Sequence, residues 1–139
     1  MRRLLFLTLL LALAGCQPAN DAFDLPTYPG ALFLAKESGD KDMGDYIAYT
    51  RVFMSNHGEI EVRKHYDELL AKQPGWNKLR PGHWSDGNCT PDSSFYYCKA
   101  VDPNRKGGYI VAQGDADGTH IRMFEVVPKS ALTPTPKAE

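Results

Sequence analysis

The sequence carries no excess of either charge. Its 139 residues include 16 Lys and Arg against 17 Asp and Glu, which gives a formal net charge of −1 at pH 7. The basic residues are dispersed, and adjacent pairs are their longest runs. A protein that binds nucleic acid through its phosphates carries a basic face or cluster. We therefore expect no nucleic-acid partner.

Cysteine is scarce, and the three that occur are Cys16, Cys89 and Cys98. None lies in a Cys-x-x-Cys motif, so thioredoxin-type redox chemistry is not indicated. A zinc site built on the last two would need two further ligands, for which His83 and His120 are the nearest candidates in the sequence. The sequence predicts no metal ion and no cofactor.

The acidic stretch Asp115-Ala116-Asp117-Gly118 lacks the surroundings of a calcium loop. In an EF-hand loop the first position carries an acidic or amide ligand and the twelfth a glutamate. Gln113 occupies the first position here, but Phe124 occupies the twelfth and has no oxygen to bind calcium. The flanking residues also favour strands over helices. We interpret the stretch as a hairpin turn.

No pairing of a nucleophile with a base is evident in the sequence. Ser38-Gly39-Asp40 and Ser85-Asp86-Gly87 lack the strand, sharp turn and helix that surround a hydrolase nucleophile. The four histidines are scattered, and no His-Glu-x-x-His pattern exists. We therefore predict that the protein is not an enzyme.

One stretch of the chain is long and almost continuously apolar. It runs from Leu4 to Leu13, is interrupted by Thr8 alone and follows Arg2 and Arg3. A run of about ten residues is too short to span a bilayer as a helix, which takes about 20. A basic start, a short apolar run and then small residues are typical of an export signal.

The end of this run, Leu13-Ala14-Gly15-Cys16, resembles the lipobox of bacterial lipoproteins at all four positions. The resemblance implies cleavage before Cys16, diacylation of its thiol through a thioether, and acylation of the new amine. Residues 1–15 are then the signal peptide, and residues 16–26 are the lipidated N-terminus and a tether. Several acyl chains on one residue make a durable membrane anchor, whereas one chain binds reversibly. The alternative is an ordinary secretory signal with an incidental cysteine.

The residue after the lipobox bears on the destination of the protein. In Gram-negative lipoproteins an aspartate there favours retention in the inner membrane, and this chain has Gln17 instead. The resemblance therefore implies a cell-envelope protein that is anchored in the outer membrane by palmitate-type acyl chains and faces the periplasm.

Export also changes what is expected of the two remaining cysteines. Disulfides form and persist in oxidising compartments outside the cytoplasm. We therefore predict a structural disulfide between Cys89 and Cys98, which lie nine positions apart in the sequence. Free thiols and a shared metal ion remain the alternatives.

A helix is predicted in the first half of the mature chain. Val62, Tyr66, Leu69 and Leu70 recur at the spacing of one helical face, and charged residues occupy the other face. Ser55 or Asn56 is the expected cap, and Gln73-Pro74-Gly75 ends the helix.

Strands account for most of the remaining chain. Aromatic, β-branched and alternating residues predict strands at residues 31–36, 45–54, 76–79, 94–101, 109–113 and 120–127. We interpret residues 37–44 as a hairpin loop, 81–88 as a long turn region and 128–139 as a disordered tail. The predicted fold class is α+β, with one amphipathic helix packed on an antiparallel sheet of about five to six strands. Residues 27–127 form this single domain.

A second resemblance covers roughly residues 26–80. Tyr28-Pro29-Gly30-Ala31, the helix with Tyr66 and Leu69-Leu70, and then Gly75-Trp76 resemble a loosely defined group of small exported bacterial proteins. The group has no settled biochemical activity. The resemblance supports the predicted fold and implies no active site.

Aromatic residues are the predicted contact surface. One sheet face is expected to be left uncovered by the helix, and exposed Tyr and Trp favour protein or ligand contacts. We expect Trp84 and Tyr96 to bind a partner there. The leading hypothesis is a lipid-anchored binding or accessory protein whose partner is an envelope protein or a cell-wall component. The alternatives are a periplasmic inhibitor or immunity protein against a toxin or lysozyme, and an envelope enzyme.

Overall fold

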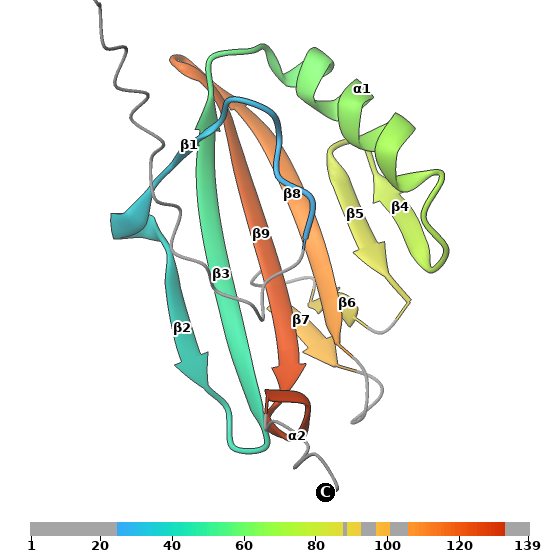
Figure 1. Ribbon diagram of the computed structural model, residues 1–139. Helices are drawn as coiled ribbons and strands as arrows, with labels where there is room; N and C mark the ends of the chain where they lie inside the picture. Colours follow the sequence, from blue (N-terminus) through green and yellow to red (C-terminus); the bar gives the residue numbers. More distant parts are fainter. Residues whose placement is uncertain (1–24, 88, 93–96, 101–105, 133–139) are drawn as a thin grey trace, which may run out of the picture.

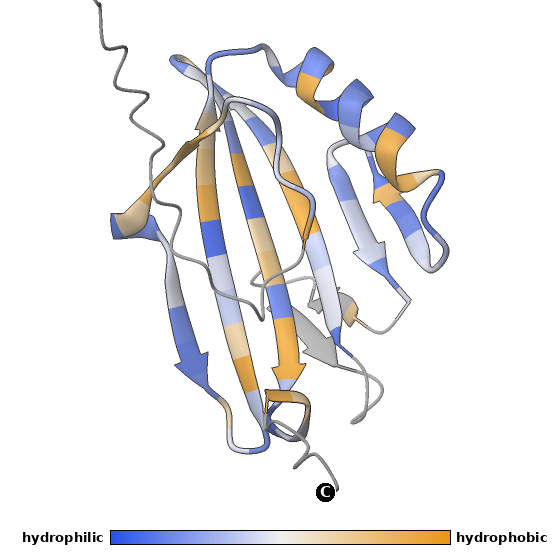
Figure 2. Cartoon of the chain, viewed as in Figure 1, coloured by the Kyte–Doolittle hydropathy of each residue, from blue (hydrophilic) through white to orange (hydrophobic). Residues whose placement is uncertain are grey.

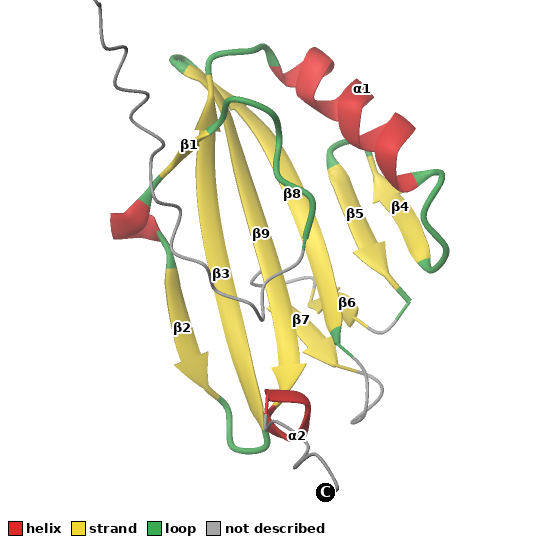
Figure 3. Ribbon diagram, viewed as in Figure 1, coloured by secondary structure: helices red, strands yellow, loops and turns green. Residues whose placement is uncertain are grey.

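The computed structural model describes residues 25–87, 89–92, 97–100 and 106–132. They form one main helix and a mainly antiparallel sheet, which confirms the predicted α+β class (Figure 3). The elements in chain order are β1 (Leu32–Phe33), the short 3₁₀ helix η1 (Ala35–Glu37), β2 (Gly39–Asp42), β3 (Tyr46–Ser55), α1 (Glu59–Leu70), β4 (Trp76–Arg80), β5 (His83–Asp86), β6 (Cys89–Asp92), β7 (Tyr97–Ala100), β8 (Gly107–Asp115), β9 (Gly118–Pro128) and α2 (Lys129–Leu132).

Seven strands make up the main sheet, in the order β1-β3-β9-β8-β5-β4, with β2 also paired to β3 (Figure 1). Strands β6 and β7 form a separate hairpin. The longest ladder joins β3 to β9, from Tyr46 opposite Pro128 to Ser55 opposite Thr119. Both faces of β3 and β9 carry buried apolar residues, because α1 covers one face of these central strands and the β6–β7 hairpin covers part of the other.

Helix α1 lies over one face of the sheet, and apolar residues recur along it between hydrophilic ones (Figure 2). Its apolar side chains belong to the core between the helix and the sheet. Val62, Tyr66 and Leu70 are buried, and Leu69 is half-buried, so the predicted apolar face is confirmed. The N-cap is Gly58 rather than Ser55 or Asn56. Ser55 is itself a buried strand residue, so it is not placed to cap the helix.

The helix-facing core is the larger of the apolar clusters. Its buried members are Tyr28, Phe53, Val62, Tyr66, Leu70, Trp84, Ile110, Ala112, Ile121 and Met123. The segment from Leu25 to Ala31 crosses the same face of the sheet as α1 (Figure 1). A Cβ at Gly108 would meet the side chain of Leu25 at 3.2 Å, so glycine there lets this segment lie close to the sheet.

Two strands of the sheet lie in stretches that the sequence analysis interpreted as loop or turn. β2 is a fully exposed Gly-Asp-Lys-Asp edge strand, and β5 contains only four residues between two turns. β2 lacks the apolar alternation that reveals a strand, because backbone pairing alone holds an exposed edge. β5 lies inside the sheet between β8 and β4, but four residues are too few to show a period. The strand expected at residues 31–36 is shorter in the structure: β1 covers Leu32–Phe33, and η1 follows at Ala35–Glu37.

The C-terminal boundary differs from the expectation of a disordered tail from residue 128. β9 continues to Pro128, and α2 occupies Lys129–Leu132. The backbone N–H of Lys129 donates to the carbonyl of Asp45 at 2.8 Å, and its Nζ lies 2.8 Å from Asp42 Oδ2. These contacts fix the turn after β9 to the β2–β3 connection. Residues 133–139 lie outside the described part.

The β6–β7 hairpin brings the two cysteines onto one face. Cys89 is opposite Ala100 and Cys98 is opposite Pro91, so the two cysteines are diagonal neighbours on the same side of the ladder. Cys89 is buried, whereas the side chain of Cys98 lies outside the described residues. The disulfide therefore stays a prediction.

Replacing Cys98 with serine is expected to lower the free energy of unfolding by about 2–3 kcal/mol, because the bridge closes a loop of about ten residues in the unfolded chain. Urea unfolding under oxidising conditions measures this loss, and added reductant should remove the difference from the wild-type protein. Two titratable thiols in denatured protein prepared from the periplasm would refute the bridge.

Candidate functional site: a hollow on the sheet face opposite the helix

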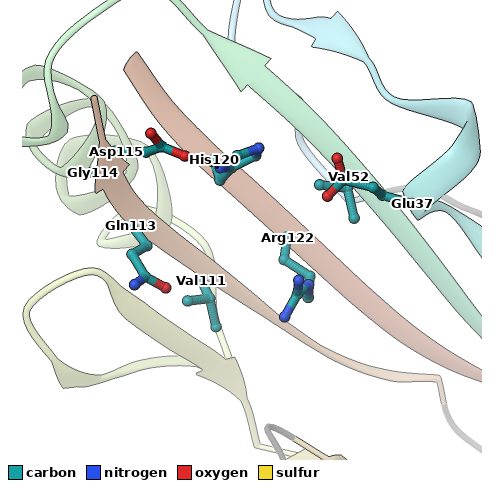
Figure 4. A pocket seen from close by; sticks show the side chains of 8 residues that line it. All are labelled: Glu37, Val52, Val111, Gln113, Gly114, Asp115, His120 and Arg122. Carbon is teal, nitrogen blue, oxygen red and sulfur yellow. Dashed lines mark ion pairs between the residues drawn. The ribbon is translucent and has the colours of Figure 1, made fainter. Parts of the chain in front are cut away.

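The sheet face that turns away from α1 carries a hollow of about 410 Å³, which we call the sheet-face hollow. It is shown from close by in Figure 4. Its lining combines a small apolar floor with acidic, basic and amide side chains: Glu37, Val52, Val111, Gln113, Gly114, Asp115, His120 and Arg122.

Strand register brings most of these side chains together. Arg122 of β9 is opposite Val52 of β3 on one side and Val111 of β8 on the other. One step along, His120 is opposite Met54 and Gln113. Directly opposed residues in antiparallel strands share a face, and alternate residues along a strand do too. The row with Arg122 and the row with His120 therefore lie side by side on this face.

A break in the edge strand supplies Glu37. β1 and β2 both pair with β3, and residues 34–38 bulge out between them as η1. Both ends of this bulge are hydrogen-bonded to Val52. The Leu34 N–H donates to the Val52 carbonyl at 2.8 Å, and the Val52 N–H donates to Ser38 Oγ at 3.0 Å. Glu37 is thereby placed beside Val52, at the β3 side of the hollow (Figure 4).

The β6–β7 hairpin closes the other end of this face. Cys89 packs in a cluster with Ala48, Tyr109, Val111 and Val126, all of which point away from α1. The hairpin lies behind β8 and β9 in Figure 1. Val111 belongs both to this cluster and to the lining of the sheet-face hollow. The hollow therefore begins where the β6–β7 hairpin no longer covers the sheet.

The far end of the hollow is the turn between β8 and β9. Asp115 is opposite Gly118 across a tight hairpin, which confirms the interpretation of this acidic stretch as a turn. Gly118 has a φ of 145°, and a Cβ there would collide with the carbonyl oxygen of Ser55. His120 Nδ1 lies 3.2 Å from Asp115 Oδ2, so the turn holds the imidazole over the hollow.

Arg122 has no acidic partner within the described part of the chain. The guanidinium groups of Arg51 and Arg63 pair with Asp40 and Glu59. Arg122 is exposed, and it makes no hydrogen bond or ion pair with any residue that the structure describes. Its charge therefore faces the hollow between two valines.

His83 extends the row that contains Arg122, since it is opposite Val111 on the next strand. Burial lowers the pKa of His83, and the nearby positive charges of Arg80 and Arg63 lower it further. Its imidazole is therefore mainly neutral at pH 7, because even an unperturbed histidine titrates near 6.5.

The structure places Trp84 on the opposite, helix-covered face. Trp84 is opposite Ile110, is 2 % exposed and belongs to the helix-facing core. Its Nε1 donates to Asp67 Oδ1 of α1 at 2.9 Å. The expectation that Trp84 offers an exposed contact is therefore corrected: the register of β5 turns it toward α1. Tyr96 lies outside the described residues.

A second polar cluster joins the opening segment to the start of α1. The Tyr28 hydroxyl lies 2.6 Å from His57 Nδ1, which is also 3.1 Å from Glu61 Oε1. Burial raises the pKa of Tyr28, with a smaller contribution from the Glu61 charge. Tyr66 donates to the Pro26 carbonyl at 3.2 Å. These contacts explain the Tyr-Pro-Gly-Ala opening structurally, because its tyrosine ties the segment to the helix.

Neither a metal site nor a membrane-spanning helix is found in the described ranges. No group of three or more His, Cys, Asp or Glu side chains among these residues is arranged to hold a metal ion. In the same part of the chain, no helix has the length and apolar character needed to cross a bilayer. Cys16 lies outside the described residues.

Sequence reasoning did not single out Arg122, Gln113 and Glu37. The alternation of β9 places His120 and Arg122 on one face, and these two polar residues on a largely apolar strand were the available signal. Gln113 and Glu37 give no such signal, since only pairing and the bulge bring them beside this face.

No protein-family model, curated protein or solved structure matches the chain. Its function is therefore inferred from the sheet-face hollow and from the sequence.

Proposed function

We propose that the protein is a lipid-anchored cell-envelope protein that acts by binding, and that the sheet-face hollow is its contact surface. The observation that carries this proposal is the unpartnered guanidinium of Arg122, exposed between Val52 and Val111 in a hollow of about 410 Å³. Binding sites commonly combine an apolar floor with a few convergent polar groups, in hollows of about 300–1,000 Å³.

The makeup of the lining favours binding over catalysis. The pair of His120 and Asp115 resembles the base and orienting acid of a catalytic site. A nucleophile would have to stand within hydrogen-bond reach of such a base. The lining residues that the structure describes include no Ser, Thr, Cys, Tyr or Lys. The pair is instead suited to donating and accepting hydrogen bonds to a ligand.

The anchor gives this surface its setting. Lipid on Cys16 would hold the domain at a membrane, and the tether of residues 16–26 would let it stand away from the bilayer. The expected partner is an envelope protein or a cell-wall component, reached from the periplasmic side of the outer membrane.

A photocrosslinking residue tests the contact surface in intact cells. Placed at Gln113, which is exposed and lines the hollow, it is expected to give a discrete adduct. The same residue placed at Lys72, which is exposed beyond the C-terminal end of α1, is the matched control and is expected to give none.

The adduct at Gln113 should also weaken when Arg122 is replaced by glutamine. Adducts at Lys72 alone would assign the contact to the helix side and overturn the proposed surface. Absence of any adduct at Gln113 would do the same.

A further inference from the structure

We propose that the sheet-face hollow recognises a small zwitterion of the amino-acid or dipeptide type, either free or as the end of a larger molecule. The carboxylate would bind Arg122, and the ammonium group would lie toward Glu37. This inference rests on the proposed function, since it names the ligand class of the same surface.

The positive pole of the hollow is suited to a carboxylate. Arginine presents a planar fork of N–H donors that matches a carboxylate in a bidentate arrangement. Arg122 is flanked on both neighbouring strands by valines that are buried. These valines give both flanks of Arg122 an apolar lining, and a charge-assisted hydrogen bond is stronger beside apolar surface than in open water. Gln113, one row away, adds an amide that can bind either a carboxylate or a peptide group.

The negative pole is Glu37 of η1, at the β3 side of the hollow. Asp115 of β8 lies at the opposite end, where it pairs with His120. The carboxylate of Glu37 makes no hydrogen bond or ion pair with another described residue. An ammonium group of the ligand would therefore give Glu37 the positively charged partner that the described residues do not supply.

The combination of both signs selects the ligand class. A simple anion would be attracted by Arg122 but repelled by the carboxylates of Glu37 and Asp115. A simple cation would be attracted by these carboxylates but repelled by Arg122. A ligand with both charges avoids either penalty, since matching potentials favour the right partner and like charges disfavour the wrong one.

The dimensions agree with a ligand of this size. A hollow of about 410 Å³ can hold a ligand of amino-acid or dipeptide size.

Three probes separate the two charges. The full-length protein, purified in detergent, is titrated by calorimetry with the dipeptide Ala-Ala, with its C-terminal amide and with its N-acetyl form. Ala-Ala is expected to bind saturably, and each capped form at least tenfold more weakly. Arg122→Gln should weaken Ala-Ala binding at least tenfold, and Glu37→Gln about threefold.

Two further variants keep the test decisive. Arg122→Lys retains the charge but loses the bidentate fork, so its affinity should fall between those of the wild type and Arg122→Gln. Arg80→Gln removes an exposed arginine that does not line the hollow, and it should bind Ala-Ala as the wild type does. All variants should keep the wild-type melting transition, because the replaced side chains are exposed.

Equal binding of Ala-Ala and both capped forms, no binding of any of them, or unchanged binding in Arg122→Gln would each overturn the ligand class. If Ala-Ala fails while Gln113 still crosslinks in cells, the contact surface stands and the zwitterion does not. If the crosslink fails as well, both proposals fall.

Discussion

Trp84→Ala is expected to lower the free energy of unfolding by about 3–5 kcal/mol. Trp84 is 2 % exposed, and its ring lies 5.4 Å from that of Tyr66, centroid to centroid. Truncation removes this packing and leaves a cavity between α1 and the sheet. It also breaks the bond from the indole N–H to Asp67, which ties β5 to the helix. The loss is large against a typical total stability of about 5–15 kcal/mol.

Urea unfolding of the purified protein measures this loss, and two variants serve as controls. Trp84→Phe loses the N–H donor and part of the indole but keeps most of the side-chain volume, so it should cost clearly less. Trp76→Ala truncates a tryptophan that is half-buried beside the same helix, and it should also cost less. If Trp84→Ala instead keeps wild-type stability and loses the Gln113 crosslink, Trp84 contributes to partner binding and not to the core.

Cys16→Ser is expected to abolish membrane attachment. A hydroxyl does not replace the thiol that accepts the diacylglyceryl group, so the variant should occur as an uncleaved precursor or as a soluble protein. Each acyl methylene buried in the bilayer contributes about 0.8 kcal/mol, and the variant loses all of them. Membrane fractionation and intact-protein mass measure the result.

Cys89→Ser is the matched control for the anchor. It also removes one thiol, but from the buried cluster under the β6–β7 hairpin, so it should retain lipidation and membrane fractionation. Normal membrane fractionation and an unchanged mature mass in Cys16→Ser would refute the lipobox interpretation. The sheet-face hollow would then belong to a protein without this anchor.

The helix and the fold class were predictable because they depend on local periodicity. Val62, Tyr66 and Leu70 recur at helical spacing, and burial of that one stripe against a sheet needs no knowledge of distant residues. The same holds for β3 and β9, whose β-branched and aromatic residues predict strands from the local sequence. The charged edge strand β2 was not predictable in this way, since its backbone pairing with β3 leaves no apolar pattern.

The sheet face on which an individual side chain lies depended on the pairing register of its strand. Trp84 lies in a strand of only four residues between two turns, and a shift of one position in pairing would reverse its direction. Pairing of β5 with β8 sets Trp84 opposite Ile110 and so toward α1.

The sequence alone was sufficient to predict the amphipathic helix and the α+β domain, which the structure confirms, because both rest on neighbouring residues. The predicted export signal with its lipobox also rests on neighbouring residues, and it lies outside the described part of the chain. Tertiary structure alone brought Glu37 beside Arg122, 85 positions further along the chain. The bulge between β1 and β2 and the ladders that β9 forms with β3 and β8 are long-range pairings. Backbone hydrogen bonds between distant strands set which side chains share a face, and no local pattern encodes that choice.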